Sequence, residues 1–382
     1  MRQGLKNKRK GREDVDERRA AVEEFSNVEL RTIGSCPFDP ILAEKNLENM
    51  IGCVHVPLGF VGPIRVNGRW ASAEFIVPMA TTEAALIATV NRGCAAITES
   101  GGADPYIVKD EMTRAPVFRV RNVAHGIEVA AWVDAHMDEL RALASTTTHH
   151  GKLLSAHSSA NGRSLFIRFA FDTGDAMGMN MATIASDRLA RRIEEETGAK
   201  LISVSGNYCV DKKPSAINFI LGRGKTVLAD ATIPRDVVIS KLKVTPEELT
   251  ETAYRKNLLG SAMSLSYGYN AHAANILAAI FIATGQDPAQ VVEGSTVITT
   301  CELVDEGLYI SVRIPALEIG TVGGGTKLPS QSEALSIMGC LGPGKAKKLA
   351  EIVASVVLAG ELSTIAAQAK GHLASAHRAL GR

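Results

Sequence analysis

The sequence lacks the long apolar runs of membrane proteins. Its longest such run, residues 276–284, is far shorter than the ~20 residues that a bilayer-spanning helix needs. Residues 1–24 are polar and highly charged, without the apolar stretch of a signal peptide. We therefore expect a soluble, cytoplasmic protein that binds no membrane.

The chain also has little net charge. Its 382 residues carry a formal charge of +1, which gives no broad field to attract nucleic acid or an acidic membrane. Apolar residues make up 46% and charged residues 22%, as in ordinary soluble globular proteins. The length suffices for two or three domains and a large core.

Cysteine is sparse and has no metal-binding spacing. No pair forms a CxxC motif, which argues against a zinc site or a disulfide framework. The pattern fits reduced thiols in a cytosolic protein. The six residues are Cys36, Cys53, Cys94, Cys209, Cys301 and Cys340.

The first third of the chain predicts few regular elements. Residues 13–27 form a weak amphipathic helix, and residues 28–65 are rich in proline and loops. A strong helix is predicted over residues 79–97, with Thr81 or Thr82 as its N-cap. Glu83 would then lie in the first turn of this helix.

A ferredoxin-like unit is predicted over residues 116–204. Strands are expected at 117–120, 152–155, 164–171 and 201–204, with helices at 126–143 and 179–197. Gly198 would end the second helix. The order β-α-β-β-α-β is the ferredoxin-like arrangement.

The remaining segments are mostly helical. Helices are predicted over residues 245–258, 271–284 and 346–369, the last of them broken near Gly360, and residues 302–313 read as a strand. The fold class is therefore α+β, with the ferredoxin-like unit inserted into a larger domain. The expected parts are an N-terminal helical segment (1–51), the large domain in two pieces (52–115 and 205–382), and the small domain (116–204).

The most informative motif is Asp211-Lys212-Lys213-Pro214, which follows Ser205-Gly206-Asn207-Tyr208. Two ammonium groups beside a carboxylate favour a negative charge, either on a substrate carboxylate or on an oxygen that gains charge during a reaction. A solvated basic turn is the alternative.

Two glycine-containing loops could approach a ligand closely. Residues 171–180 join a predicted strand to a helix whose N-terminus would attract phosphate, although the GxGxxG pattern is absent. Residues 319–326 contain three consecutive glycines. A tight turn and a flexible connector are the respective alternatives.

Other polar residues stand out against apolar surroundings. Asp287 follows the predicted helix 271–284, where the helix dipole disfavours a carboxylate unless a cation such as Lys212 pairs with it. Asn270, His272 and Asn275 suggest a ligand edge. His377, five residues after His372 near the C-terminus, could donate a proton near neutral pH.

Taken together, these segments resemble 3-hydroxy-3-methylglutaryl-coenzyme A (HMG-CoA) reductases, from about residue 48 to residue 377. The resemblance rests on the shared order of several segments. They are Glu48-Asn49-Met50-Ile51-Gly52, Met79-Ala80-Thr81-Thr82-Glu83, Asn91-Arg92-Gly93-Cys94, residues 174–180, residues 205–214, Gly222-Arg223-Gly224-Lys225, residues 270–275, Gly285-Gln286-Asp287 and residues 320–326.

This resemblance implies residue roles. Glu83, Lys212, Asp287 and His377 match the family's catalytic residues. Arg114, Ser205, Asp211 and Lys213 match positions around the hydroxymethylglutaryl group, and Asn91, Arg92, Lys256, His272 and Asn275 match coenzyme A contacts. Cofactor contacts are expected at Asp175, Met177, Gly178, Met179, Asn180, Asn207, Gly323 and Gly324.

The resemblance further implies a soluble class I enzyme of archaeal or bacterial type. Such an enzyme reduces HMG-CoA to mevalonate with two hydrides from NADPH, uses no metal, and is a homodimer or homotetramer with its active site between subunits. Thr148-His149 stands where animal relatives carry Ser-Arg, which leaves the preference for NADPH over NADH open. An NAD-dependent enzyme that oxidises mevalonate and a non-catalytic acyl-coenzyme A-binding or nucleotide-binding protein are the alternatives.

Overall fold

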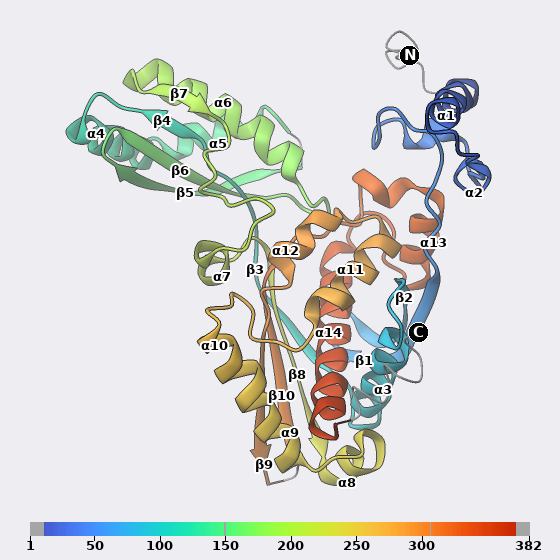
Figure 1. Ribbon diagram of the computed structural model, residues 1–382. Coiled ribbons are helices and arrows are strands. Elements are labelled where there is room, and N and C mark those ends of the chain that lie inside the picture. Colours follow the sequence, from blue (N-terminus) through green and yellow to red (C-terminus); the bar gives the residue numbers. More distant parts are fainter. Residues whose placement is uncertain (1–10, 149, 306, 372–382) are drawn as a thin grey trace.

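A computed structural model describes residues 11–148, 150–305 and 307–371 (Figure 1). The strands are β1 (Leu58–Asn67), β2 (Ser72–Ala80), β3 (Asp104–Arg114), β4 (Val117–Arg119), β5 (Lys152–Asn161), β6 (Ser164–Asp172), β7 (Lys200–Ser203), β8 (Gly224–Pro234), β9 (Ile298–Val304) and β10 (Gly307–Leu317).

Helices connect and cover these strands. They are α1 (Arg12–Ser26), α2 (Arg31–Gly34), α3 (Leu86–Glu99), α4 (Val123–Ala135), α5 (Met137–Ser145), α6 (Met179–Thr197), α7 (Ala216–Leu221), α8 (Arg235–Val237), α9 (Pro246–Thr252), α10 (Ser261–Met263), α11 (Ala273–Thr284), α12 (Val291–Gly294), α13 (Pro329–Ile337) and α14 (Ala346–Ala369). Shorter turns are the 3₁₀ segments η2 (Pro40–Ala43), η5 (Pro288–Gln290) and η6 (Gly324–Lys327), and the π-helical segments η3 (Val238–Leu242) and η4 (Ala253–Gly260).

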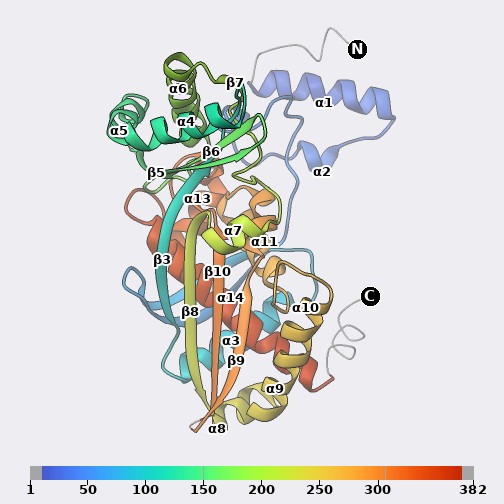
Figure 2. The same cartoon turned by 90° about the vertical axis from the view of Figure 1, so that its left-hand side faces the viewer.

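One long antiparallel sheet runs through most of the molecule. Its strand order is β7-β4-β6-β3-β8-β10-β9, with β5 paired to β6, while β1 and β2 form a separate hairpin. Figure 2 shows β3 rising from the large body toward the small domain. Helices packed on antiparallel strands confirm the predicted α+β fold class.

The small domain contains the strand order β7-β4-β6-β5, with each neighbouring pair antiparallel. This is the order that a ferredoxin-like β-α-β-β-α-β chain produces. Its hydrophobic core, which includes Phe118, Phe169 and Leu189, is separate from that of the large body. Gly198 ends α6 in the left-handed conformation, as predicted. The domain boundaries stay predictions.

Helix α14 forms the centre of the large body. It packs against α3, α11 and β8, and it is almost completely buried. It is long and apolar enough to cross a membrane, but the apolar stretch is wholly enclosed by the protein, as in a core helix of a globular protein. A Cβ on Gly93 would lie 1.8 Å from the Ala359 carbonyl oxygen, so glycine is what lets α3 approach α14. The predicted break at Gly360 is wrong, because α14 is continuous through it.

The N-terminal segment lies apart from the small domain in Figure 1. The predicted helix over residues 13–27 is confirmed as α1. Val15 is buried in a small cluster with Ala43 and Met50, and Arg18 Nε donates to the Met50 carbonyl oxygen at 2.9 Å. These contacts attach α1 to the segment that leads into β1.

Several predicted boundaries are wrong. Residues 79–80 end strand β2, and α3 begins at Leu86, so Glu83 lies in the turn before the helix. The helix predicted over residues 126–143 is interrupted at His136 between α4 and α5. The region around 302–313 is a hairpin of β9 and β10. Strands β1, β2, β3 and β8 were not predicted.

Candidate active site

The tandem-lysine loop connects β7 to α7 in a strained backbone conformation. Asn207, Val210 and Lys212 have φ values of 64°, 50° and 59°, in the left-handed region that non-glycine residues rarely adopt. Val210 is β-branched, so its conformation is the most costly of the three. Strain of this kind persists only where surrounding contacts enforce it, and it is concentrated at functional sites.

Lys212 and Asp287 form an ion pair. Lys212 Nζ lies 2.7 Å from Asp287 Oδ2, although the two side chains remain 43% and 28% exposed. Gly285 ends α11 in the left-handed conformation, and Asp287 then caps η5 by accepting from the Ala289 N–H. The prediction that Lys212 pairs with this carboxylate is confirmed. The pair presents a fixed ammonium at the surface of the chain.

A buried network fixes the backbone of the lysine loop. Arg223 is fully buried and contacts three carboxylates: Asp211 at 3.0 Å, Glu293 at 2.8 Å and Glu318 at 3.2 Å. Glu293 also accepts from the Lys212 backbone N–H at 2.5 Å and from Asn218 Nδ2 at 2.8 Å. The contact to Glu293 explains how Lys212 is held at positive φ.

Two carboxyl groups of this network have pKa values that are shifted in opposite directions. Burial opposes ionisation of Asp211, but Arg223, a hydrogen bond from Gln290 and then Arg114 hold the pKa of its carboxyl below the ordinary value. Burial raises the pKa of Glu318 well above its usual range, despite the nearby Arg223. Asp211 is therefore the stable anion, and Glu318 retains its proton more easily.

Arg114, Ser205 and Asp211 lie together, as predicted. Arg114 Nη1 donates to Ser205 Oγ at 3.2 Å and lies 3.9 Å from Asp211 Oδ2. Its Nε and Nη2 both donate to Thr183 Oγ1 on α6. Lys213 Nζ donates to the Asp211 carbonyl oxygen, which keeps a second ammonium on the same loop.

Glu83 is not joined to this cluster within one chain. It is exposed, its N–H donates to Thr81 Oγ1, and its carboxylate accepts from Asn275 Nδ2 at 3.1 Å. Asn275 lies near the start of α11, whereas Asp287 follows its end. The nine residue steps from Asn275 to Thr284 span ~14 Å along the helix axis. Helix α11 therefore separates Glu83 from the Lys212–Asp287 pair.

A cleft of about 880 Å³ opens beside the lysine loop. Pro214 lines it from that loop, and Lys256 and His272 line it from the large domain. Burial lowers the pKa of the Lys256 ammonium, and the negative charge of Glu361 partly offsets this lowering. The cleft is wide enough for a large ligand, with a cation and an imidazole on its wall.

Glu361, which is fully buried in α14, holds one wall of this cleft. Its carboxylate accepts from the N–H groups of Ala271 and His272, at 2.7 and 2.8 Å, and from Thr299 Oγ1 at 2.7 Å. His272 Nε2 lies 2.6 Å from Thr364 Oγ1 of the same helix. The conformation of the 270–272 segment thus depends on one buried carboxylate.

Asn91 and Arg92, both predicted to bind coenzyme A, are engaged with the protein. Asn91 Oδ1 accepts from the Gly62 N–H, and Arg92 bonds the side chain and carbonyl oxygen of Ser363. Burial lowers the pKa of Arg92. The contacts attach α3 to β1 and α14, and they leave the ligand role of both residues a prediction.

The two glycine-containing loops lie against each other. The Asp175 carboxylate accepts from the N–H groups of Gly344 and Ala346 at the start of α14, and its carbonyl oxygen accepts from the Thr321 N–H. A Cβ on Gly320 would lie 2.6 Å from the Met177 backbone nitrogen. Asp175 therefore fixes the loops, and its carboxylate is already hydrogen-bonded.

The surface formed by these loops fits a phosphate-bearing cofactor. Gly178 precedes α6, and no side chain within the described ranges caps this 19-residue helix, so its first N–H groups can meet an anion. Gly323 and Gly324 have positive φ, and a Cβ on either would meet nothing within 4 Å. Asn180 and Asn207 are exposed, while Met179 is buried against Arg223.

Two predicted features lie outside the described residues. They are His377, with its neighbour His372, and His149 of the Thr148-His149 pair.

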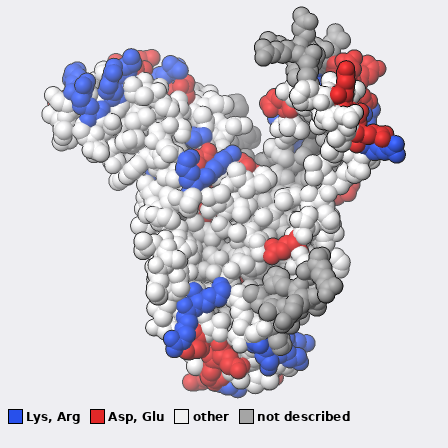
Figure 3. Space-filling model, in the orientation of Figure 1, with Lys and Arg blue, Asp and Glu red and all other residues white. Residues whose placement is uncertain are grey.

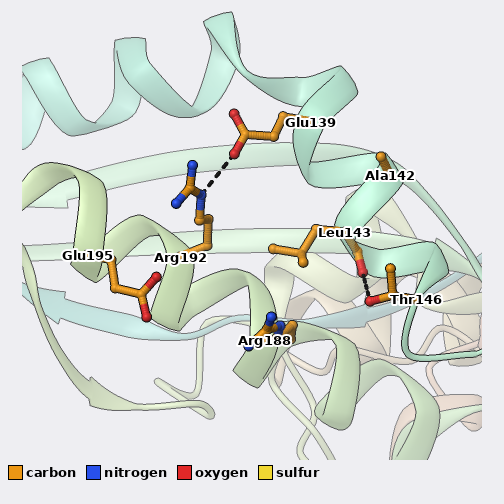
Figure 4. Close-up of a pocket in the computed structure, with 7 residues that line it drawn as sticks. All are labelled: Glu139, Ala142, Leu143, Thr146, Arg188, Arg192 and Glu195. Atoms are coloured by element: carbon orange, nitrogen blue, oxygen red, sulfur yellow. Dashed lines mark hydrogen bonds and ion pairs between the residues drawn. The ribbon is translucent and has the colours of Figure 1, made fainter.

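A further pocket of about 430 Å³ lies between α5 and α6 on the small domain (Figure 4). Arg192 Nε donates to Glu139 at 2.8 Å, and Arg192 also pairs with Glu196. No predicted site residue lines this pocket. Figure 3 shows charged side chains gathered on the small domain, whereas the middle of the molecule in this view carries few of them.

Comparison with known proteins identifies the family of this chain. The family model "Hydroxymethylglutaryl-coenzyme A reductase" matches residues 14–382. The chain belongs to this HMG-CoA reductase family. The expected family and its oxidoreductase activity are confirmed.

Named HMG-CoA reductases from archaea and a plant are similar along most of their length. The relative from Pyrococcus horikoshii is 54% identical over 96% of this chain and 91% of its own. The Haloferax volcanii relative is 50% identical over 96% and 93%, and rice reductase 1 is 45% identical over 96% and 71%.

The fold is shared with a more distant reductase. A class II HMG-CoA reductase from Streptococcus pneumoniae, solved with NADPH, aligns with a TM-score of 0.71 over 92% of this chain and 96% of its own, at 20% identity. At that identity, the likeness concerns the fold.

For this reductase, sequence reasoning missed Glu293 and Glu361 and gave Arg223 no role. A sequence signal existed for Glu361, because it is the single carboxylate within the apolar residues 352–369. None existed for Glu293, which meets Arg223 from a position 70 residues away.

Proposed function

We propose that this chain is a class I HMG-CoA reductase that converts HMG-CoA to mevalonate and free coenzyme A with NADPH. The observation that carries the proposal is the Lys212–Asp287 pair, set on a buried network beside a cleft lined by Lys256 and His272. Identities of 45–54% to relatives named as this enzyme support it. The class assignment is supported by the much lower identity, 20%, to the class II structure.

Two NADPH molecules, bound one after the other, would each supply one of the two hydrides that the thioester needs to become an alcohol. Lys212 stabilises the negative charge that develops on the carbonyl oxygen, because its ammonium is held in place by Asp287 and by the Glu293 contact to its backbone. Asp287 also keeps the ammonium oriented between turnovers.

Two further residues move protons. Glu83 donates a proton to the aldehyde oxygen during the second reduction. His377 protonates the departing coenzyme A thiolate; a free thiol has a pKa of about 8.5, so an unprotonated thiolate re-adds readily. Once His377 has protonated the coenzyme A thiolate, the thiol cannot readily re-add to the aldehyde.

Binding residues divide between the two ends of the substrate. Arg114, Ser205, Asp211 and Lys213 surround the hydroxymethylglutaryl group, where Arg114 and Lys213 supply cations for its carboxylate. Coenzyme A extends along the cleft past Lys256 and His272, with Asn91, Arg92 and Asn275 at its edges. NADPH meets the surface of Gly178, Met179, Asn180, Asn207, Gly323 and Gly324, with Asp175 and Met177 shaping the loop.

The enzyme works as a homodimer or a larger even assembly. Within one chain, α11 separates Glu83 from Lys212, so a second copy is needed to bring a Glu83 carboxyl to each lysine. Tyr106 and Leu228, cross-strand partners on β3 and β8, are 62% and 36% exposed, which leaves an apolar sheet face for such a contact. We place the assembled enzyme in the cytoplasm.

The test is an initial-rate assay of purified protein with HMG-CoA, following nicotinamide absorbance with NADPH and with NADH. We expect turnover with a higher kcat/KM for NADPH. A preference for NADH with faster mevalonate oxidation would favour the catabolic alternative. The absence of turnover with either cofactor would favour a non-catalytic protein that binds acyl-coenzyme A or a nucleotide.

We expect Glu361→Gln to raise the KM for HMG-CoA about tenfold with little change in kcat. The glutamine amide cannot accept both backbone N–H bonds of the 271–272 segment, and an unmatched buried polar group costs ~1–3 kcal/mol. Steady-state kinetics measure the change in KM, and thermal unfolding measures the loss of stability. Glu302→Gln, at an exposed position of strand β9, is the matched control. An unchanged KM in a variant that folds would remove Glu361 from the binding wall.

A further inference from the structure

Two cysteines meet where the N-terminal segment joins the large domain. Cys36 and Cys53 are 17 residues apart, and their Sγ atoms lie 3.0 Å from each other. Both residues are half-buried, and all six cysteines are free thiols in the structure. No metal-binding group of three or more histidine, cysteine or acidic residues occurs within the described ranges, so a shared metal does not account for the pair.

The backbone around both cysteines is held by several independent contacts. The Cys53 N–H donates to the Ile33 carbonyl oxygen at 2.9 Å, and a Cβ on Gly52 would lie 1.9 Å from the same oxygen. From α1, Arg18 Nε donates to Met50 O at 2.9 Å and Arg19 Nη1 to Ile51 O at 3.4 Å. The short sulfur distance is therefore imposed by the fold.

We propose that Cys36 and Cys53 are a redox-active pair that forms a reversible intrachain disulfide, locking the N-terminal segment to the chain that leads into β1. The bond closes a loop that contains η2 and residues 37–52. It spans the junction between the N-terminal segment and β1. Nothing in the proposed reduction of HMG-CoA requires it.

The oxidant is a low-molecular-weight disulfide such as oxidised glutathione. One cysteine thiolate attacks it, forms a mixed disulfide and releases one glutathione thiol. The second cysteine then attacks the mixed disulfide and releases the other. The protein loses two protons and two electrons, and the oxidant gains them as it becomes two thiols.

The environment of Cys53 sets the rate. Burial, and then the neighbouring Cys36, raise the pKa of the Cys53 thiol to about 12. Because the thiolate is the attacking species, the step in which Cys53 attacks is slow at neutral pH and accelerates as the pH rises.

Peptide mapping tests the pair directly. The full chain is equilibrated with oxidised glutathione at pH 8, its remaining thiols are alkylated, and it is digested without reductant. Trypsin cuts after Arg31, Lys45 and Arg65, so the disulfide would join peptides 32–45 and 46–65. We expect this linked pair, the loss of two of the six free thiols, and a Tm raised by about 2–4 °C.

Variants separate this bond from other oxidation. Cys36→Ser and Cys53→Ser should lose both the linked peptides and the Tm shift, while Cys301→Ser, the half-buried control, should keep them. Dithiothreitol should reverse both effects. Wild-type protein that still has six free thiols after this treatment, counted in denaturant, would overturn the proposal, as would a disulfide-linked dimer on a non-reducing gel.

Discussion

Replacing Lys212 by methionine is expected to lower kcat by ~10²–10³-fold while leaving the protein folded. Methionine keeps much of the apolar stem and removes the ammonium, which is the donor nearest to the developing oxyanion in our account. The side chain is 43% exposed, so its loss costs little stability. Steady-state kinetics with HMG-CoA and NADPH, together with a thermal unfolding curve, measure both effects.

Two other lysines provide controls, one on the same loop and one elsewhere on the surface. Lys213→Met removes the second ammonium of the same loop and should raise the KM for HMG-CoA more than it lowers kcat, because Lys213 is assigned to the substrate carboxylate. Lys241→Met removes a surface cation that pairs with Glu99, and it should behave as wild type. Equal kinetic losses at Lys212 and Lys241 would show that the Lys212 effect is not specific to the site.

Replacing Glu83 by glutamine is expected to lower kcat by ~10²–10⁴-fold, the usual contribution of a positioned acid. Glutamine preserves the size of the side chain and can still accept from Asn275, so the turn before α3 should keep its conformation. What it loses is the proton that the aldehyde oxygen needs. Reduction of HMG-CoA and of free mevaldehyde should both be impaired.

The control for Glu83 is an exposed carboxylate at the start of strand β2. Glu74→Gln changes an exposed carboxylate on β2 and should leave kcat unchanged. If Glu83→Gln reduced mevaldehyde at the wild-type rate, another group would be the proton donor and Glu83 would serve binding alone.

The sequence predicted those parts of the site that depend on neighbours along the chain. Asp287 follows the end of a helix whose dipole requires a compensating cation, and the structure supplies Lys212. Gly198 ends its helix as expected because it adopts a left-handed conformation that suits glycine, and Gly285 ends α11 in the same way. The strand order of the small domain also follows from its alternating pattern.

What could not be predicted depends on contacts between distant segments. Strand β2 and helix α3 are both rich in apolar residues, so periodicity did not place the turn that contains Glu83 between them. Arg223 contacts Glu293 and Glu318, which lie 70 and 95 residues further along the chain. No local sequence pattern predicts such a buried cluster. Gly360 resembled a helix breaker but is required for close packing, because a Cβ there would lie 2.2 Å from Ile276 Cδ1.

In the proposed enzyme, Glu83 of one subunit and Lys212 of another act on the same carbonyl oxygen. Subunit mixing tests this arrangement most directly. Glu83→Gln and Lys212→Met chains, each nearly inactive alone, are co-expressed with different tags, and the assembled mixture is assayed. In a mixed dimer, one of the two shared sites contains both native residues, as the two-fold symmetry of such an interface requires.

Because random assembly makes half of the dimers mixed, the account predicts that the preparation regains about a quarter of the wild-type kcat. Dimers purified through both tags should regain about half. If tandem purification yields mixed dimers that remain as inactive as the parent variants, Glu83 and Lys212 do not meet across a subunit boundary, and the proposed shared active site is wrong.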